Sequence, residues 1–456
     1  MPSLVLNRVE RGRYLDSVAL MRLSRRLAAR PGVEDAALMI GSPSNKALLR
    51  DAGLLAAEGE AAGPNDVLIA VRANDQRAAQ SALESALEAP AEKTGSSGLT
   101  HARTLRAALD RLPQANLALI SVPGDFAALE ARKALAAGLN ALIFSSGVPL
   151  EEERALKRLA AEKGLLLMGP DCGTALLAGT PVAFANVVPR GDIGIVSASG
   201  TGLQEVSCLI ARLGGGVSHG IGVGGRDLDE RVGALGTLAA IDALEADAAT
   251  KTIVLISKPP SASVAQRVLS RLKMSKPSVV CFLGLDEPGL APTLRAAAEM
   301  AVGRKLAEET VAAAKTKGRV MGLYCGGTLC SEAEIIFRRR GWAGHRFVDL
   351  GGDQFTRGRP HPMIEPELRN EHIARAMADP EVGVVLVDLV LGYGSHPDPA
   401  AVLAKCDLRK PVVASVVGTE EDPQVRSRQV VRLREAGVLV APSNAQAAEW
   451  AAALAY

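Results

Sequence analysis

The sequence is poor in aromatic residues, and it has no excess of charge of either sign. Phe, Trp and Tyr make up only 3% of the 456 residues. So few aromatic rings disfavour a surface on which nucleic-acid bases stack. The 52 basic and 50 acidic residues give a net charge of +2, which does not favour nucleic acid or an acidic surface as a partner. We therefore expect no nucleic-acid partner.

Long apolar runs, a signal peptide and clustered metal ligands are also missing. No apolar run reaches the roughly 18 residues that a membrane span needs. The chain carries Arg8, Glu10 and Arg11 where a signal peptide would be apolar. The six cysteines have neither zinc spacing nor the density of a disulfide-bonded secreted domain. These features predict a cytoplasmic protein with no membrane partner and no metal.

A dinucleotide-binding fingerprint is absent as well. Apolar strands expected at 117–122, 141–144 and 165–168 alternate with helical segments, which is typical of a Rossmann-like domain. However, Ser121–Phe126 follows the first of these strands where a G-x-G-x-x-G turn would stand. NAD-type binding is therefore disfavoured.

The stretch from Ile193 carries the strongest signal for a binding site. Ile193–Val196 is a short β-branched run, which is typical of a buried parallel strand. Ser197–Gly202 contains only small residues, and Leu203–Leu213 has the apolar spacing of a helix. The unpaired amides at the start of such a helix attract an anion. The alternative is an ordinary tight turn between a strand and a helix.

The same pattern begins a second time at Arg319. In both copies a Gly-Thr pair opens the helix, and a glutamate follows five residues after the glycine, as Glu205 and Glu332. A Gly-Gly pair, an apolar strand and a Lys-Pro pair then follow in the same order. This repeat predicts two copies of a doubly wound α/β domain, at residues 190–300 and 318–456.

One helix start stabilises an anion by only about 0.3–1 kcal/mol, or about 2 kcal/mol when partly buried. We therefore expect the two glycine turns to face one anion, with help from cations that follow the strands. The loop at 357–363, which contains two prolines, adds a histidine. The alternative is that this loop is solvated and has no binding role. The candidate cations and the histidine are Arg226, Lys258, Arg357, Arg359 and His361.

The remainder of the chain predicts two further domains. Residues 1–93 alternate strands and helices and form a small α/β domain, whose loops could bind a ligand or a partner and for which an assembly or regulatory role is equally open. A linker at 89–99 is rich in Ala, Gly and Ser. The Rossmann-like domain covers 100–188. The predicted fold class is thus multidomain α/β.

Several of these stretches resemble succinyl-CoA synthetase. Gly194–Thr201 and Gly222–Gly225 resemble the ligase region of its α subunit, and Leu167–Cys172 resembles the end of its CoA-binding domain. Residues 318–456, with Gly326–Leu329 and Val348–Gly352, resemble the carboxyl-terminal domain of its β subunit. The resemblance implies a Rossmann-like CoA-binding-type domain followed by two flavodoxin-like ligase domains.

The departures from that family bear on function. The synthetase passes phosphate through a histidine after the strand matching Val279–Gly284, but Leu285–Met300 contains no histidine. The glutamate that supports that histidine is replaced by Lys258. The glycine-rich CoA turn is missing, and no ATP-grasp domain is expected. We therefore expect no certain cofactor, and CoA is disfavoured.

The whole chain is similar to the FdrA family. The stretches that carry this similarity are Ile40–Ala47, Ser199–Gly202, Gly224–Leu228, Ser257–Pro260, Gly358–Ile364 and Gly418–Gln424. The similarity implies one subunit of an oxamate carbamoyltransferase in allantoin catabolism, active with two partner subunits in an oligomer. The reaction converts carbamoyl-oxamate (oxalurate) and phosphate into oxamate and carbamoyl phosphate. The alternatives are an acyl-CoA synthetase and a non-catalytic scaffold.

We predict three groups of site residues. The first binds phosphate or carbamoyl phosphate, and comprises Ser199, Gly200, Thr201, Gly202, Gly326, Gly327 and Thr328. The second binds the carboxylate of the substrate, and comprises Arg226 and Arg357. The third polarises the carbamoyl carbonyl and is catalytic, and comprises Lys258, Arg359 and His361.

Overall fold

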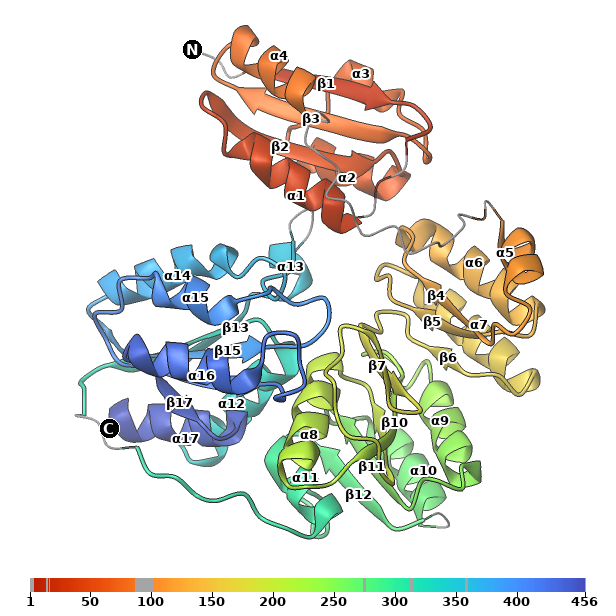
Figure 1. The fold of residues 1–456 in the computed structure, drawn as a ribbon, viewed down its shortest axis with the longest axis vertical. Coiled ribbons are helices and arrows are strands. Elements are labelled where there is room, and N and C mark those ends of the chain that lie inside the picture. Colours follow the sequence, from red (N-terminus) through yellow and green to blue (C-terminus); the bar gives the residue numbers. More distant parts are fainter. Residues whose placement is uncertain are drawn as a thin grey trace. The chain divides into compact units, whose positions relative to one another are not determined.

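The computed structural model describes residues 4–13, 15, 17–86, 102, 104–273, 276–311, 315–356 and 360–455. Contacts group the chain into two units, Met1–Leu112 with Asp353–Pro360, and Pro113–Gly352 with His361–Tyr456. Each unit has buried apolar clusters of its own. The chain is a multidomain α/β protein, as the sequence predicts (Figure 1).

The first unit is a three-stranded antiparallel sheet with the order β1-β3-β2, covered by helices. The central strand β3 is almost entirely buried because it has a neighbour on each side. Strands and helices alternate in this region as the sequence predicts, whereas the linker 89–99 lies outside the described residues. The elements are β1 (Leu4–Glu10), α1 (Ser17–Ala28), β2 (Val33–Ile40), α2 (Pro43–Asp51), α3 (Ala57–Glu60), β3 (Val67–Ala73), α4 (Gln76–Ser85), α5 (Leu105–Arg111) and α13 (Asp353–Thr356).

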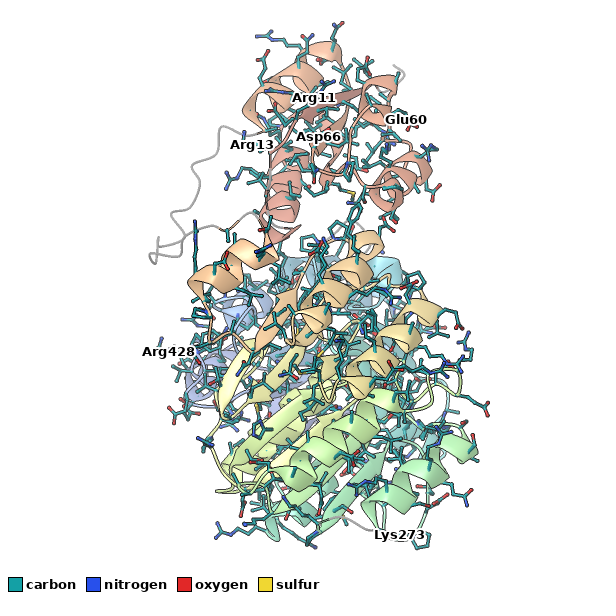
Figure 2. The ribbon with its side chains drawn as sticks, turned by 90° about the vertical axis from the view of Figure 1, so that its right-hand side faces the viewer. Arg11, Arg13, Glu60, Asp66, Lys273 and Arg428 are labelled. Atoms are coloured by element: carbon teal, nitrogen blue, oxygen red, sulfur yellow. The ribbon has the colours of Figure 1, made fainter. Side chains whose placement is uncertain are left out.

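A single carboxylate fixes two loops of this unit. Asp66 accepts hydrogen bonds from the amides of Gly12, at 2.9 Å, and Gly63, at 2.8 Å. These bonds and the nearby Arg11 hold the pKa of Asp66 below its usual value (Figure 2). The turn after β1 is therefore held by hydrogen bonds within the chain.

The second unit begins with a short Rossmann-like sheet. Three parallel strands have the order β4-β5-β6 and are joined by helices. A hairpin then leads away from this sheet and pairs with the next one. The elements are β4 (Leu117–Ile120), α6 (Gly124–Ala136), β5 (Asn140–Ile143), α7 (Leu150–Glu162), β6 (Leu167–Met168), β7 (Thr174–Leu177) and β8 (Thr180–Ala183).

The two repeated domains have the same parallel strand order. The first sheet runs β12-β11-β9-β10-β7-β8 and the second runs β14-β13-β15-β16-β17. In each, the first strand of the copy lies between its second and third strands, which is the flavodoxin-like order. The first copy contains β9 (Ile193–Ser197), α8 (Gly200–Arg212), β10 (Val217–Gly222), α9 (Leu235–Ala246), β11 (Thr252–Ser257), α10 (Ala262–Leu272), β12 (Ser278–Phe282) and α11 (Leu294–Val302). The second contains β13 (Arg319–Tyr324), α12 (Gly327–Arg339), β14 (Arg346–Asp349), α14 (Glu367–Ala378), β15 (Val382–Val390), α15 (Pro399–Ala404), β16 (Val412–Val417), α16 (Arg426–Glu435), β17 (Leu439–Ala441) and α17 (Asn444–Ala455).

The two glutamates of the repeat join these copies to each other. Glu205 on α8 accepts from the amide of Asn444, at 3.1 Å, where the last helix of the second copy begins. Glu332 on α12 accepts from the amide of Leu294, at 2.7 Å, where the last helix of the first copy begins. The Asn444 side chain also donates to Glu332, at 2.8 Å. Each copy therefore caps a helix of the other, and one apolar cluster contains residues of both.

The burial of Glu332 makes the stability of this interface depend on pH. Burial raises the pKa of Glu332 to about 7. A carboxyl whose pKa is higher in the folded state contributes stability at low pH, and this contribution is lost as the pH rises through about 7. Between pH 5 and 8 the loss is on the order of 3 kcal/mol.

Glu332→Gln is therefore expected to unfold with a much weaker dependence on pH than the parent chain. Urea unfolding at several values between pH 5 and 8 measures this difference. Glu334→Gln is the matched control, because Glu334 lies on the same helix but is exposed. Equal pH dependence of the parent chain and Glu332→Gln would show that Glu332 does not titrate in this range.

Candidate functional site

The turn that opens α8 leaves two backbone amides open. Ser199 is the N-cap, and its hydroxyl accepts from the Gly202 amide at 2.9 Å. Its own amide donates to the Ser197 hydroxyl at 3.1 Å. Among the described residues, no hydrogen bond engages the amides of Gly200 and Thr201, which lie in the first turn of the helix. This helix start can accept an anion.

Helix α8 begins at Gly200, three residues before the start predicted at Leu203. Glycine lowers helix propensity, which is why the sequence pattern placed Gly200–Gly202 in the turn. The Ser199 cap offsets this cost. A Cβ at 202 would lie 3.0 Å from the Ser199 hydroxyl, a tight contact that glycine avoids.

The equivalent turn at α12 is already occupied by carboxylates of the chain. Asp388, fully buried at the end of β15, accepts from the amides of Cys325 and Gly326, each at 2.7 Å. Arg369 donates to both the carbonyl and the carboxylate of Asp388, at 2.6 and 3.2 Å. Burial raises the pKa of Asp388, while Arg369 and the amides oppose this rise. The Gly326 amide is thus engaged within the chain, which limits its predicted role in phosphate binding.

The two turns meet directly, as expected from the repeat. The Ser199 hydroxyl donates to the Thr328 hydroxyl at 2.5 Å. On the equivalent side, a Cβ on Gly326 would lie 3.0 Å from the methyl group of Thr201. The starts of α8 and α12 therefore face each other across a junction formed by small residues. The assignment of these residues to an anion remains a prediction.

Lys258 lies beside this junction. It follows β11, whose Ile256 pairs with Ser197 at the end of β9 and accepts from the amide of Ala198. Its side chain is exposed, and its charge acts on Asp349 at the end of β14. Lys258 therefore follows the strand that neighbours β9, at the edge of the sheet where α8 begins.

The turn at α8 also lines a small cavity of about 10 Å³, room for about one water molecule. Most of a phosphate-sized anion at Gly200 would therefore lie outside this cavity. The lining residues come from the end of the Rossmann-like sheet and from the ends of β9 and β10, and comprise Asp171, Cys172, Gly173, Thr174, Ser197, Ala198, Ser199, Gly200, Gly222 and Gly224.

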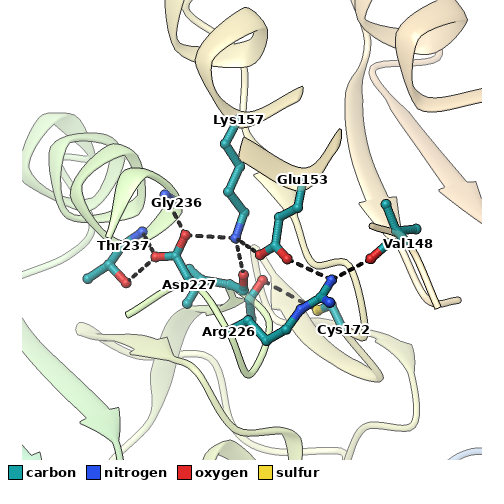
Figure 3. Close-up of polar contacts among 10 residues, drawn as sticks. Val148, Glu153, Lys157, Cys172, Arg226, Asp227, Gly236 and Thr237 are labelled. Carbon is teal, nitrogen blue, oxygen red and sulfur yellow. Dashed lines mark hydrogen bonds and ion pairs between the residues drawn. The ribbon is translucent and has the colours of Figure 1, made fainter. Parts of the chain in front are cut away.

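Arg226 forms part of a buried charge network between the Rossmann-like domain and the first ligase-type domain (Figure 3). Its guanidinium pairs with Glu153 of α7 and donates to the carbonyl of Val148, both at 2.8 Å. Lys157 of α7 pairs with Glu153 at 2.8 Å and with Asp227 at 2.7 Å. Both contacts use one terminal nitrogen of the guanidinium, which leaves the other donors of Arg226 available, and its predicted role in binding a carboxylate remains a prediction.

Asp227 connects this network to the start of α9. It accepts from the amides of Gly236, at 2.9 Å, and Thr237, at 2.7 Å, and from the Thr237 hydroxyl at 2.7 Å. The Lys157 ammonium is the remaining donor to Asp227, and this ammonium also donates to the carbonyl of Val223 at 2.9 Å. This network fixes the loop after β10.

His361 is a neutral imidazole in a confined position. Burial lowers its pKa to about 4. Its Nδ1 accepts from the Met363 amide at 3.1 Å, so Nε2 carries the proton of the neutral ring. A Cβ on Gly351 would lie 2.5 Å from Nε2, which explains why glycine stands there. The catalytic role of His361 stays a prediction, and Arg357 and Arg359 lie outside the described residues.

His219 lies within β10, which extends through it to Gly222, and its Nδ1 accepts from the Ala178 amide at 3.1 Å. It is thus a hydrogen-bonded structural residue. His219 pairs with Gly194 at the amino end of β9, away from the turn. Glycines 220 and 222 suggested an end to the strand. Gly222 instead allows a close approach, since a Cβ there would lie 2.5 Å from the Thr174 carbonyl oxygen.

Asp349 is a candidate that the sequence analysis did not single out. Its Oδ1 accepts from the Gly351 amide at 3.0 Å, and a Cβ on Gly327 would lie 2.5 Å from its Oδ2. Burial raises its pKa, against the opposing effects of the Gly351 amide and Lys258. Asp349 ends a strand at the same edge of the sheet as the glycine turn. That position in the sequence pattern could have marked it as a site candidate.

Comparisons with known proteins find similarity over parts of the chain and over nearly its whole length. Residues 323–454 match the family model described as CoA-ligase, and residues 3–104 match the model described as AllF, heavy metal-associated domain. The uncharacterized protein YahF of Escherichia coli K12 is 41% identical over 488 alignment positions, gaps included, and the alignment covers 94% of this chain and 95% of YahF. Succinate–CoA ligase subunit alpha 2 of Archaeoglobus fulgidus is 28% identical over 46% of this chain and 74% of its own. A solved acetyl-coenzyme A synthetase 1 from Ca. Korarchaeum cryptofilum covers 74% of this chain and 82% of its own, with a TM-score of 0.31 and 20% identity.

The residues of the amino-terminal domain do not fit the heavy metal in the name of its model. Residues 3–104 contain no cysteine and a single histidine, His101. Soft metals in proteins are held mainly by thiolate ligands. In the part of the chain that the structure describes, no group of three or more potential metal ligands is gathered, and no helix is long and apolar enough to cross a membrane.

Proposed function

Because the chain belongs to the FdrA-like family that includes YahF and has a succinyl-CoA ligase-type domain, we propose that it is a subunit of an oxamate carbamoyltransferase. In this proposal the chain acts with two partner subunits in ureide catabolism. Phosphate binds between the starts of α8 and α12 and attacks the carbamoyl carbon of oxalurate. Oxamate leaves, and carbamoyl phosphate is formed.

The observation that supports this proposal is the contact between the two helix starts. The Ser199–Thr328 hydrogen bond brings two helix N-termini to one place, and two amides of α8 are open there. The open start of α8 supplies about 0.3–2 kcal/mol, and the Lys258 ammonium adds to it, whereas millimolar binding of a small anion requires about 4 kcal/mol. In the proposed reaction phosphate itself is the nucleophile. No histidine therefore has to carry a phosphoryl group.

A CoA ligase is the alternative, and the charges of the Rossmann-like domain disfavour it. A cavity of about 400 Å³ lies between the starts of α6 and α7. It is lined by Asp125 and Glu152, while Arg132 is paired with Glu152 at 2.6 Å. Acidic residues at two helix starts repel the phosphates of CoA.

The test is the reaction itself. The chain assembled with its two partner subunits is expected to form carbamoyl phosphate from oxalurate and phosphate, which ³¹P NMR detects as a new signal. Succinate with CoA and ATP serves as the alternative substrate set. Formation of an acyl-CoA without carbamoyl phosphate would contradict the proposal and identify the chain as a CoA ligase. If neither substrate set gave a product, the chain would be a non-catalytic scaffold.

A further inference from the structure

Asp349 and Asp388 both lie at the start of α12, but their surroundings differ. Asp388 is fully buried and is engaged by Arg369 and by two backbone amides. In the part of the chain that the structure describes, no arginine pairs with Asp349, whose carboxylate accepts from the Gly351 amide and is also stabilised by the Gly352 amide. Asp388 therefore holds the turn in place, whereas Asp349 is able to change its partners.

The position of Asp349 connects it to both parts of the anion site. Its carboxylate lies against Gly327, the first residue of α12. The next residue, Thr328, bonds to Ser199 at the start of α8. From the other side, the charge of Lys258 acts on the same carboxylate. An anion bound at this junction would thus lie beside a carboxyl group as well as an ammonium group.

The proposed reaction requires the transfer of one proton. Hydrogen phosphate forms a C–O bond to the carbamoyl carbon of oxalurate, and the C–N bond to the oxamate nitrogen breaks. Carbamoyl phosphate leaves as the dianion, so the proton of hydrogen phosphate must reach the departing nitrogen. Without that proton, oxamate would leave as an unstable amide anion. One carboxylate that first accepts and then donates the proton balances the step.

We propose that Asp349 carries this proton from phosphate to the leaving nitrogen, an inference that rests on the proposed function. Lys258 holds the phosphate and keeps Asp349 near it. Burial raises the pKa of Asp349, which brings it closer to the working pH and favours proton exchange. A carboxylate that served only to cap the helix would not need to change its protonation state.

Asp349→Asn in the assembled enzyme tests this role. We expect kcat to fall by at least about a hundredfold, which is the lower end of the usual effect of a general acid–base group. The KM for phosphate should stay the same or fall, because a negative charge has left the site. The acidic limb of the pH profile of kcat should disappear. Asp349→Glu should recover part of the activity, and Glu334→Gln, on the exposed face of α12, should behave as the parent chain does.

Phosphate binding gives a second readout that does not depend on turnover. In the parent chain, phosphate affinity should weaken as Asp349 ionises with rising pH, and Asp349→Asn should lack this dependence. Turnover of Asp349→Asn within about threefold of an active parent enzyme would overturn the role of Asp349 and leave the proposed function standing. A parent enzyme that forms no carbamoyl phosphate would overturn both.

Discussion

Ser199→Asp is expected to lower phosphate affinity by about a thousandfold while α8 stays folded. Aspartate caps a helix as well as serine does, so the bond to the Gly202 amide is retained. The new carboxylate, however, places a negative charge about 4 Å from the anion, which costs about 4 kcal/mol near a protein surface. Calorimetric titration of phosphate into the assembled protein measures the difference.

Ser199→Asn is the matched control, because asparagine caps equally well and carries no charge. It should bind phosphate far more tightly than the aspartate variant does, and the two variants, which lose the same hydroxyl contact to Thr328, should have similar thermal midpoints. If the aspartate variant bound phosphate within about threefold of the asparagine variant, the anion would have to lie somewhere other than at this turn.

Lys157→Met is expected to destabilise the protein by about 3–5 kcal/mol, because it leaves buried charges without their partner. Lys157 is 2% exposed and bonds to Glu153, Asp227 and the Val223 carbonyl. Without the ammonium, Asp227 keeps only neutral donors, while Glu153 keeps Arg226. The contact between the Rossmann-like domain and the ligase-type domain should be the first to open.

Urea unfolding tests this prediction. The quantity compared is the free energy of the first unfolding transition. Lys163→Met is the control, since Lys163 ends the same helix and is exposed. A loss below about 1 kcal/mol for Lys157→Met would mean that water or Arg226 replaces the ammonium, and that the network contributes little to the contact.

The strands, the repeat and the meeting of the two turns could be predicted from the sequence. β-branched runs and helical spacing are local signals. The same order of repeated residues after Gly200 and after Gly327 indicated that the two segments share one fold. In parallel sheets these turns lie at the same edge, so their approach followed from topology. The glutamates Glu205 and Glu332 were visible as a repeated pair, although their capping of the opposite copy was not.

The partners of the individual charges could not be predicted. Arg226 follows a strand at the correct edge, yet α7 brings Glu153 to it from 73 residues earlier in the chain. Asp388 occupies the turn at the start of α12 because β15 pairs with β13. The sequence does not show which strand is the neighbour of β13. Long-range pairing of this kind depends on side-chain geometry, which the sequence pattern does not give.

Difference density from crystals of the assembled enzyme with phosphate would test the central claim most directly. A tetrahedral peak is expected at about 3 Å from the amide nitrogens of Gly200 and Thr201, with the Lys258 ammonium in contact. An empty turn at a phosphate concentration that saturates the enzyme would contradict the claim.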